Sequence, residues 1–250
     1  MRDVLIVSAL SLVPRRAAAR CMGVMARTGL SRLGASAFVR AYGVDLSEAA
    51  EADFPTLEAL FTRRLRPGAR PVDPSPEALV SPVDGVAAWV GTSRDGRFEL
   101  LLGQVHDLAA LLGAPCDGER EVAVLYLSPR DYHRVHAPYD GRVTRWRYVP
   151  GTLWPVFPAA VRRVRGLFAR NERVVGRLAG ADLELDVVLV GAFGVGRIEV
   201  GWADLLTNTG AGAREGEVDW PVGRGGELGV FHLGSTVIVV APAGRVAWTV

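Results

Sequence analysis

The stretch RPGARPVDPSP, residues 66–76, separates two parts of the chain that differ in sequence pattern. Proline lacks an amide hydrogen and disfavours a helical conformation of the residue before it, so a helix cannot continue through this stretch. On its N-terminal side the pattern is helical, and Pro55 is suited to the first turn of a helix that runs to Phe61. We therefore expect a helical segment, residues 1–66, that ends at this connector.

The second part, residues 67–250, contains short apolar runs between turn-forming residues, a pattern typical of strands. Gly, Pro and Asp separate the runs, which are residues 122–127, 183–190, 198–202 and 236–240. Residues 108–112 have the character of one short helix. The sequence thus predicts an α+β protein in which an N-terminal helical segment precedes a β-rich domain of mainly antiparallel strands.

The composition excludes several classes of protein. The chain has 250 residues, 49% of them hydrophobic, which provides a sizeable core and excludes a disordered protein. Its 29 basic residues, all arginine, nearly balance 27 acidic ones, so we expect no nucleic acid partner. Cys21 and Cys116 match no metal-binding spacing and are too few for a disulfide framework, which favours a reducing compartment.

The N-terminal segment combines positive charge with an apolar face. Arg16, Arg20 and Arg27 fall within one sector of a helix, and Met22 and Met25 lie on the opposite side. Such a helix can bind an anionic membrane surface through charge and apolar insertion. It can also pack its apolar face on the main domain as a cap, and the pattern fits both arrangements.

The apolar run at residues 4–13 is too short for a spanning helix, which needs roughly 20 residues. A secretory signal cleaved near residues 17–19 is an alternative, but Arg15 and Arg16 follow the run where a signal is neutral. We therefore expect no spanning helix in this segment. A second basic stretch, residues 162–177, is another candidate surface for phosphate groups.

Three residues far apart in the sequence have the side chains of a nucleophilic catalytic set. Asp84, His136 and Ser235 supply a carboxylate, an imidazole and a hydroxyl, and such groups can be assembled from any order in the chain. His133 and His136 together fit the start of a zinc site, but no further ligand motif completes it, so we expect no metal. A serine hydrolase is one interpretation, although the Gly-x-Ser-x-Gly motif is absent.

Two motifs and several shorter matches occur together along the chain. Residues 126–136 read YLSPRDYHRVH, and residues 234–236 read GST. The shorter matches are at residues 84–85, 149–151, 167–174 and 190–192. In this order they make the chain resemble the bacterial phosphatidylserine decarboxylase proenzymes over most of its length. Residues 154–157, WPVF, depart from the more polar stretch usual in that family, so details of the substrate pocket are not implied.

The resemblance implies a chain that cleaves itself. The hydroxyl of Ser235 attacks the carbonyl of Gly234, with His136 as the base and Asp84 fixing the tautomer of that imidazole. A glycine before the serine avoids a side chain that would crowd the attack. The implied products are a large chain, residues 1–234, and a small chain, residues 235–250.

The resemblance also implies the reaction and its cofactor. Ser235 becomes a covalent pyruvoyl group, and phosphatidylserine forms a Schiff base with it, loses CO2 and leaves as phosphatidylethanolamine, a step of phospholipid biosynthesis. His133 then protonates the carbon that lost CO2 or steers the headgroup. No free cofactor is implied, and the chain has no dinucleotide-binding glycine motif or P-loop.

The expected partners follow from a lipid substrate. We expect a peripheral enzyme on the cytoplasmic face of the bacterial cell membrane, bound to anionic lipid through residues 1–66, and a homodimer as in similar enzymes. A catalytically silent membrane-bound β module is the remaining alternative. Of the other histidines, we expect His106 on the surface, whereas His232, close to Gly234, has no direction that the sequence fixes.

Overall fold

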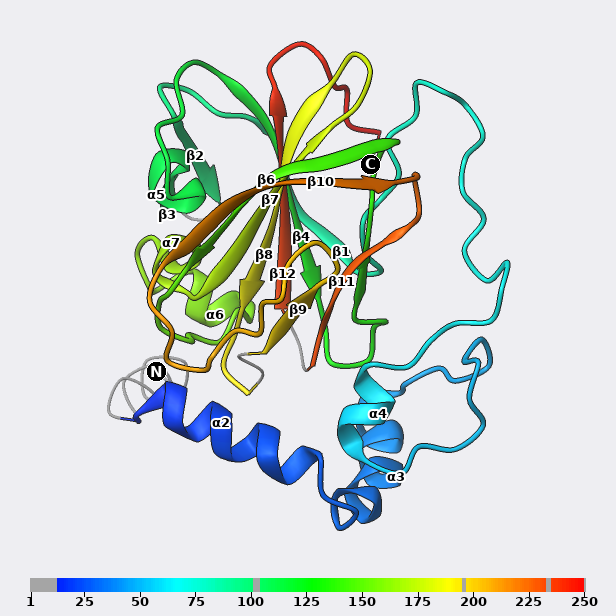
Figure 1. Ribbon diagram of the computed structural model, residues 1–250. Helices are drawn as coiled ribbons and strands as arrows, with labels where there is room; N and C mark the ends of the chain where they lie inside the picture. The colour runs from blue at the N-terminus through cyan, green and yellow to red at the C-terminus, as the bar shows by residue number, and fades with distance from the viewer. Residues whose placement is uncertain (1–12, 101–103, 195–196, 233–234, 250) are drawn as a thin grey trace.

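The computed structural model describes residues 13–100, 104–194, 197–232 and 235–249. Its helices are α2 (Arg15–Ala26), α3 (Ser31–Tyr42), α4 (Leu57–Phe61), α5 (Leu108–Leu112), α6 (Pro158–Val161) and α7 (Leu167–Arg170). Its strands are β1 (Val86–Thr92), β2 (Arg97–Leu100), β3 (Gln104–Asp107), β4 (Arg120–Leu127), β5 (Arg134–His136), β6 (Gly141–Val149), β7 (Arg173–Ala179), β8 (Glu184–Gly191), β9 (Ile198–Val200), β10 (Arg214–Val222), β11 (Glu227–Phe231) and β12 (Ser235–Pro242). Helices α2, α3 and α4 lie together at one end of a β-rich body (Figure 1).

A seven-stranded antiparallel sheet, in the order β1-β4-β12-β8-β7-β6-β10, organises the molecule. Strand β12 lies between β4 and β8, and its sequence is rich in β-branched residues. Val237 and Ile238 are neighbours in β12, belong to different cores, and are both 0% exposed. Burial on both faces explains why this strand is a continuous apolar run instead of an alternating one.

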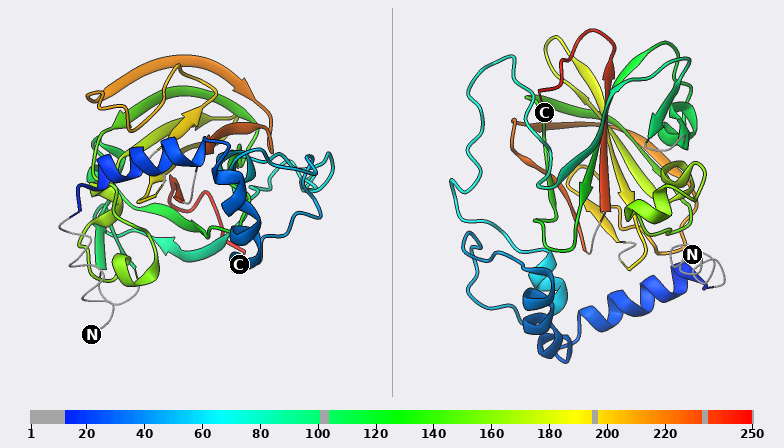
Figure 2. Two further views of the ribbon diagram at one scale, coloured as in Figure 1. Left: turned by 90° about the horizontal axis from the view of Figure 1, so that it is seen from below. Right: turned by 180° about the vertical axis from the view of Figure 1, so that it is seen from behind.

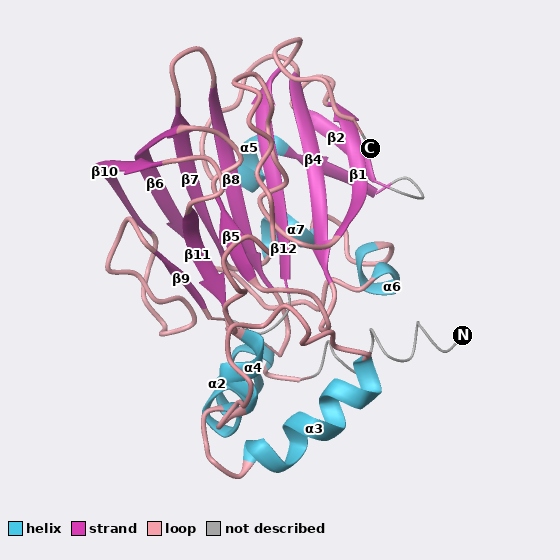
Figure 3. Ribbon diagram, turned by 90° about the vertical axis from the view of Figure 1, so that its right-hand side faces the viewer, coloured by secondary structure: helices cyan, strands magenta, loops and turns pink. Residues whose placement is uncertain are grey.

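Each face of the large sheet carries its own hydrophobic core. Strands β5, β11 and β9 form a second, three-stranded sheet, and its residues Val135, Ile198 and Phe231 pack in one core with Val237. Residues of α5, α7 and strand β2 pack in the other core with Ile238. Figure 3 shows β9 and β11 on one side of the large sheet and α5 and α7 on the other. The α+β fold with mainly antiparallel strands is therefore confirmed.

Most predicted elements are present where the sequence placed them. Helix α5 has the predicted bounds, and the four predicted strands correspond to β4, β8, β9 and β12. Helix α4 begins at Leu57 and not at Pro55, because the side chain of Thr56 accepts a hydrogen bond from the amide of Ala59 (3.0 Å) and caps the helix. Residues 66–85, which include the connector, form no helix or strand and run beside the β-rich body (Figure 2).

The end of β4 and the start of β12 lie side by side at the end of the large sheet that faces the helices. β4 ends at Leu127, and β12 begins at Ser235, directly opposite Leu127 on one side and Gly191 of β8 on the other. Within the part of the chain that the structure describes, no helix has both the length and the apolar character needed to cross a bilayer.

Candidate active site

Ser235 begins the central strand of the large sheet, with strands paired on both sides. Strand β4, its partner, leads from Leu127 into the loop that carries His133 and then into β5 with His136. Gly234 and its peptide bond to Ser235 lie outside the described residues, so cleavage at this bond stays a prediction. The sheet therefore brings the backbone of Ser235 and the histidine loop to the same end of the molecule.

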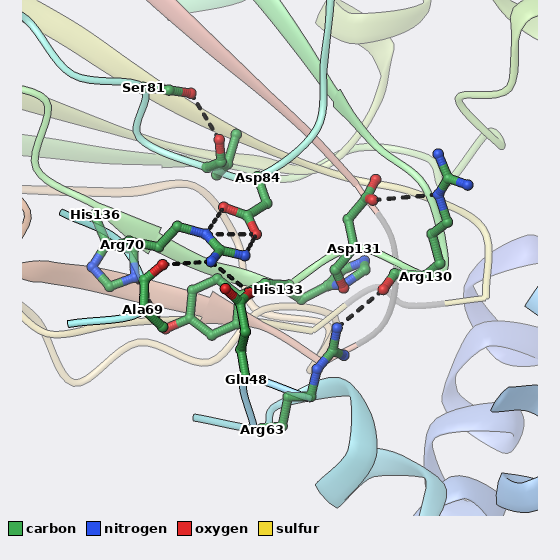
Figure 4. A network of polar contacts seen from close by, with 12 residues as sticks. Glu48, Arg63, Ala69, Arg70, Ser81, Asp84, Arg130, Asp131, His133 and His136 are labelled. Atoms are coloured by element: carbon green, nitrogen blue, oxygen red, sulfur yellow. Dashed lines mark hydrogen bonds and ion pairs between the residues drawn. The ribbon is translucent and has the colours of Figure 1, made fainter. Parts of the chain in front are cut away.

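Asp84 lies in the loop before β1 and is held by an arginine of the connector. Its carboxylate accepts hydrogen bonds from Arg70, Nε to Oδ1 at 3.0 Å and Nη2 to Oδ2 at 2.6 Å (Figure 4). Arg70 also donates to Glu48 at 2.7 Å, and the hydrogen bonds to Asp84 contribute most to raising the pKa of Arg70. A side chain at Gly85 would collide with the carbonyl oxygen of Tyr126, which lies 2.4 Å from the position of a Cβ, so glycine is required after Asp84.

His136 is held between a backbone carbonyl and a phenol. Its Nδ1 lies 2.8 Å from the carbonyl oxygen of Gly225, and its Nε2 lies 3.1 Å from the hydroxyl of Tyr132. Because a carbonyl only accepts, Nδ1 carries the hydrogen, and the Tyr132 hydroxyl donates to Nε2. Burial raises the pKa of Tyr132 to about 12, so this phenol stays protonated.

The predicted contact between Asp84 and His136 is absent, because both side chains have other partners. The carbonyl of Gly225 fixes the imidazole tautomer, a role that the sequence assigned to Asp84. The two loops are nevertheless adjacent, since the amide of His136 donates to the carbonyl of Pro82 at 2.8 Å. Tyr132 and Gly225 are thus site residues that sequence reasoning missed, although Tyr132 stands within the motif that carried the family resemblance.

His133 is fully buried and offers one nitrogen without a partner. Its Nδ1 donates to the carbonyl oxygen of Asp131 at 2.7 Å, while Nε2 has no hydrogen-bond partner among the described residues. The ring meets the edge of Phe61 with centroids 5.1 Å apart. Burial lowers the pKa of His133 to about 4, so the imidazole is neutral near pH 7 and Nε2 carries a free lone pair. Such a nitrogen accepts a proton before it can donate one.

Arginine side chains from two segments fix the histidine loop. Arg63, which follows α4 and is 5% exposed, donates to the carbonyl of Arg130 at 3.0 Å (Figure 4). Arg134 donates back to the carbonyl of Thr62 at 2.8 Å and to Glu227 at 2.7 Å. These hydrogen bonds connect the end of α4 to both sides of His133. The helical part and the histidine loop therefore form one rigidly bonded unit.

An apolar cavity of about 800 Å³ opens beside this unit, between the helices and the end of the large sheet. Its lining includes Met25, Phe38, Phe61, Leu127 and Phe157. Phe61 contacts the ring of His133, and Leu127 is the cross-strand partner of Ser235, so the cavity adjoins the residues of the site. A cavity of this size and polarity suits hydrocarbon.

Two of the three arginines of the α2 sector, Arg16 and Arg20, reach the β-rich body. Arg16 lies 3.7 Å from the carboxylate of Glu172, which is fully buried, and Arg20 donates to the carbonyl of Asn208 at 2.7 Å. Glu172 also accepts from the amide of Asn208 at 2.7 Å and from the hydroxyl of Tyr148. Burial raises the pKa of Glu172, and the hydrogen bonds from Tyr148 and Asn208, together with the charges of Arg16 and Arg20, oppose this shift.

Several apolar side chains of α2, α3 and the turn between them are exposed, and Met22, Met25 and Leu30 among them also line the cavity. Met22 and Met25 of α2 are 43% and 63% exposed. Leu30, just before α3, is 79% exposed, and Leu33, within α3, is 82% exposed. Arg16 and Arg20 thus hold α2 to the protein, Met22 and Met25 border the cavity, and attachment of α2 to an anionic membrane stays a prediction. The periodicity located the two faces but did not show which one meets the protein.

His106 is the second correction. The sequence placed it on the surface, whereas it is 1% exposed and lies between the rings of Phe98 and Phe168, with centroids 5.2 and 5.0 Å away. Burial lowers the pKa of His106 to about 4, so it behaves as a neutral aromatic ring of the core. Among the described residues, no group of three or more His, Cys, Asp or Glu side chains is arranged to hold a metal ion.

Comparison with known proteins identifies the family. The model of the family described as phosphatidylserine decarboxylase matches residues 57–250. The phosphatidylserine decarboxylase proenzyme of Anaeromyxobacter sp. (strain K) is 44% identical over 259 residues, which cover 98% of this chain and 92% of that protein. The proenzyme of Halorhodospira halophila (strain DSM 244 / SL1) is 48% identical over 219 residues, 84% of this chain and 75% of that protein. The chain therefore belongs to the phosphatidylserine decarboxylase family, a family of carboxy-lyases.

Proposed function

We propose that the protein decarboxylates phosphatidylserine to phosphatidylethanolamine, using a pyruvoyl group made from its own Ser235. The observation that supports this most strongly is the buried Nε2 of His133, which has no hydrogen-bond partner among the described residues, at the end of the sheet where Ser235 begins β12. The His133 ring contacts Phe61, which lines an apolar cavity suited to lipid chains. Membership of a decarboxylase family favours this reaction over a serine hydrolase and over a silent membrane module.

The residues present fit the group that the family implies. A pyruvoyl group supplies an electron-withdrawing carbonyl that takes up the electron pair left when CO2 departs. Ser235 is suited to carry it, because the strand pairing with Leu127 and Gly191 fixes its backbone. The neutral imidazole of His133 is the nearby group equipped to move a proton.

His133 acts in this proposal as a proton carrier. With Nδ1–H donated to the carbonyl of Asp131, only Nε2 is free, and a neutral ring presents a lone pair there. Nε2 takes a proton from the substrate ammonium group and later returns it to the carbon that lost CO2, so that no net proton is gained or lost at the ring. The sequence suggested that His133 donates a proton to this carbon or steers the headgroup. The proposal adds an earlier step, because a neutral imidazole must take up a proton before it can donate one.

His136 and Asp84 are assigned to self-cleavage of the bond between Gly234 and Ser235. His136 accepts the hydroxyl proton of Ser235 through Nε2, so the Tyr132 hydroxyl that now donates to this nitrogen turns away during the step. The carbonyl of Gly225 keeps the other nitrogen protonated throughout. Asp84 stabilises the imidazolium that forms, which requires a carboxylate released from, or shared with, Arg70.

We assign membrane attachment to the helices. We assign residues 1–66 as the docking segment and residues 67–250 as the catalytic domain. The exposed side chains of Met25, Leu30 and Leu33 provide apolar insertion, and the cavity behind them takes an acyl chain. Attachment to anionic lipid at the cytoplasmic face of the membrane and a homodimer are proposed from the family resemblance alone.

The intact mass of the purified protein tests this proposal. We expect two chains that correspond to cleavage between Gly234 and Ser235, with a small chain whose N-terminus is blocked to Edman sequencing. Ser235→Ala gives one uncleaved chain that releases no CO2 from phosphatidylserine. A Ser235→Ala protein that is cleaved and active would exclude the pyruvoyl mechanism.

A further inference from the structure

His232 is anchored two residues before the bond that the proposed function cleaves. It directly follows strand β11, and its amide donates to the carbonyl of Arg197 at 3.1 Å. Its Nδ1 lies 3.0 Å from Oε1 of Glu58, and its Nε2 lies 3.3 Å from Oε2 of Glu199. The sequence left the direction of this side chain open, and the structure turns it toward helix α4.

Glu58 is the centre of this cluster. It stands in the first turn of α4, its side chain is 19% exposed, and its Oε1 also accepts from Nη1 of Arg197 at 2.9 Å. One carboxylate therefore bonds both the His232 ring and the residue before β9. Helix α4 is joined in this way to the segment that leads to the cleavage site.

The chemistry of the contacts shows which of them is strong. Burial, with Arg197 adding to it, lowers the pKa of His232, and Glu58 and Glu199 oppose this shift. Each ring nitrogen faces a carboxylate oxygen, and the shorter contact, from Nδ1, goes to Glu58. Glu199 is 60% exposed, whereas Glu58 is 19% exposed, so the contact with Glu58 is the less screened of the two. The hydrogen bond from His232 to Glu58 has an ionised acceptor and is the main side-chain anchor of this segment.

We infer that Glu58 is a positioning residue for self-cleavage, an inference that rests on the proposed function. On the far side of the cleaved bond, Ser235 is fixed by its pairing with Leu127 and Gly191. On the near side, Glu58 fixes His232. With both flanks of this bond anchored, less orientational freedom is lost in the cleavage step.

The test measures the cleavage rate of newly translated full-length precursor by gel. A hydrogen bond to a charged group is worth enough to change a rate by roughly tenfold, so Glu58→Ala slows cleavage about tenfold. Glu58→Gln keeps an acceptor oxygen for His232, so its cleavage rate falls less, by about threefold. CO2 release per processed chain falls much less than the cleavage rate in both variants. His232→Ala repeats the cleavage defect without changing α4.

A double-mutant cycle separates positioning from a general loss of structure. If Glu58 acts through His232, the variant carrying both alanines cleaves no more slowly than the slower single variant. Asp53→Ala is the matched control, because it removes another carboxylate of the helical part that binds an arginine, Arg32 at 2.8 Å, and it cleaves at the wild-type rate. If Glu58→Ala misfolds, the cleavage rates of Glu58→Gln and His232→Ala test the inference instead.

Two results overturn the inference while leaving the proposed function intact. One is wild-type cleavage rates in both Glu58→Gln and His232→Ala alongside a wild-type chain that cleaves. The other is fully additive defects in the double variant. A wild-type chain that is never cleaved overturns the proposed function and this inference together.

Discussion

His133→Asn separates the two nitrogens of the imidazole. The amide nitrogen of asparagine occupies nearly the place of Nδ1 and can still donate to the carbonyl of Asp131, 2.7 Å away in the wild type. The variant loses only Nε2, the partnerless atom that we assign to proton transfer. The precursor should therefore mature, whereas CO2 release per processed chain should fall by about 10²- to 10⁴-fold, the usual contribution of a general acid or base.

Gel analysis of cleavage and CO2 release from phosphatidylserine vesicles, run on the same preparation, measure both effects. His106→Leu is the control, because His106 is the other buried imidazole whose pKa is lowered to about 4, and it lies outside the site. His106→Leu should release CO2 at the wild-type rate. Wild-type turnover in processed His133→Asn would refute the proton-transfer role. An uncut His133→Asn chain together with normal cleavage in His136→Ala would mean that the two site histidines exchange roles.

Three further predictions follow from the site, the helices and the core. Asp84→Ala and His136→Ala should accumulate uncleaved precursor on a gel, and normal cleavage in either would remove that residue from the maturation step. Leu33→Asp should reduce sedimentation with anionic vesicles, since this leucine is 82% exposed on the apolar side; unchanged binding would assign docking to another surface. Because the pKa of His106 falls to about 4 on folding, the unfolded state binds more protons between pH 6.5 and 4, so stability falls on acidification, by about 2 kcal/mol from this residue between pH 7 and 5. Urea unfolding of His106→Leu should lack that part of the pH dependence, and an unchanged pH profile would contradict the assignment.

The strands were predictable because burial left a direct trace in the sequence. Strand β12 is covered on both faces, so Val237 and Ile238 both had to be apolar and the run stands out. Helix α5 was predicted with its bounds because Gly113, at φ +65°, ends it in a left-handed conformation that glycine favours. Both signals are local, and local signals are what a single sequence contains.

The site residues were predictable as residue types but not as pairs. Asp84 and His136 fit a catalytic pair by chemistry, yet their observed partners are Arg70 and Gly225, which stand 14 and 89 positions away from them. The partner of His136 is a backbone carbonyl, a group that every residue carries, so no side-chain pattern marks it. The aromatic and charged neighbours in the motif, such as Tyr132, were visible in the sequence, but their direction depends on how β5 lies against β11.

The arginines of α2 show what a helical pattern leaves undetermined. A helical periodicity establishes that one side is basic and the other apolar, but the side that faces the protein depends on what the protein offers there. Here Glu172 is 0% exposed and accepts from the Asn208 amide, and Arg16 lies near enough to offset part of the cost of burying that charge. Arg16 and Arg20 are engaged in this way, and the exposed apolar side chains of Met25, Leu30 and Leu33 are the ones that we propose for membrane insertion.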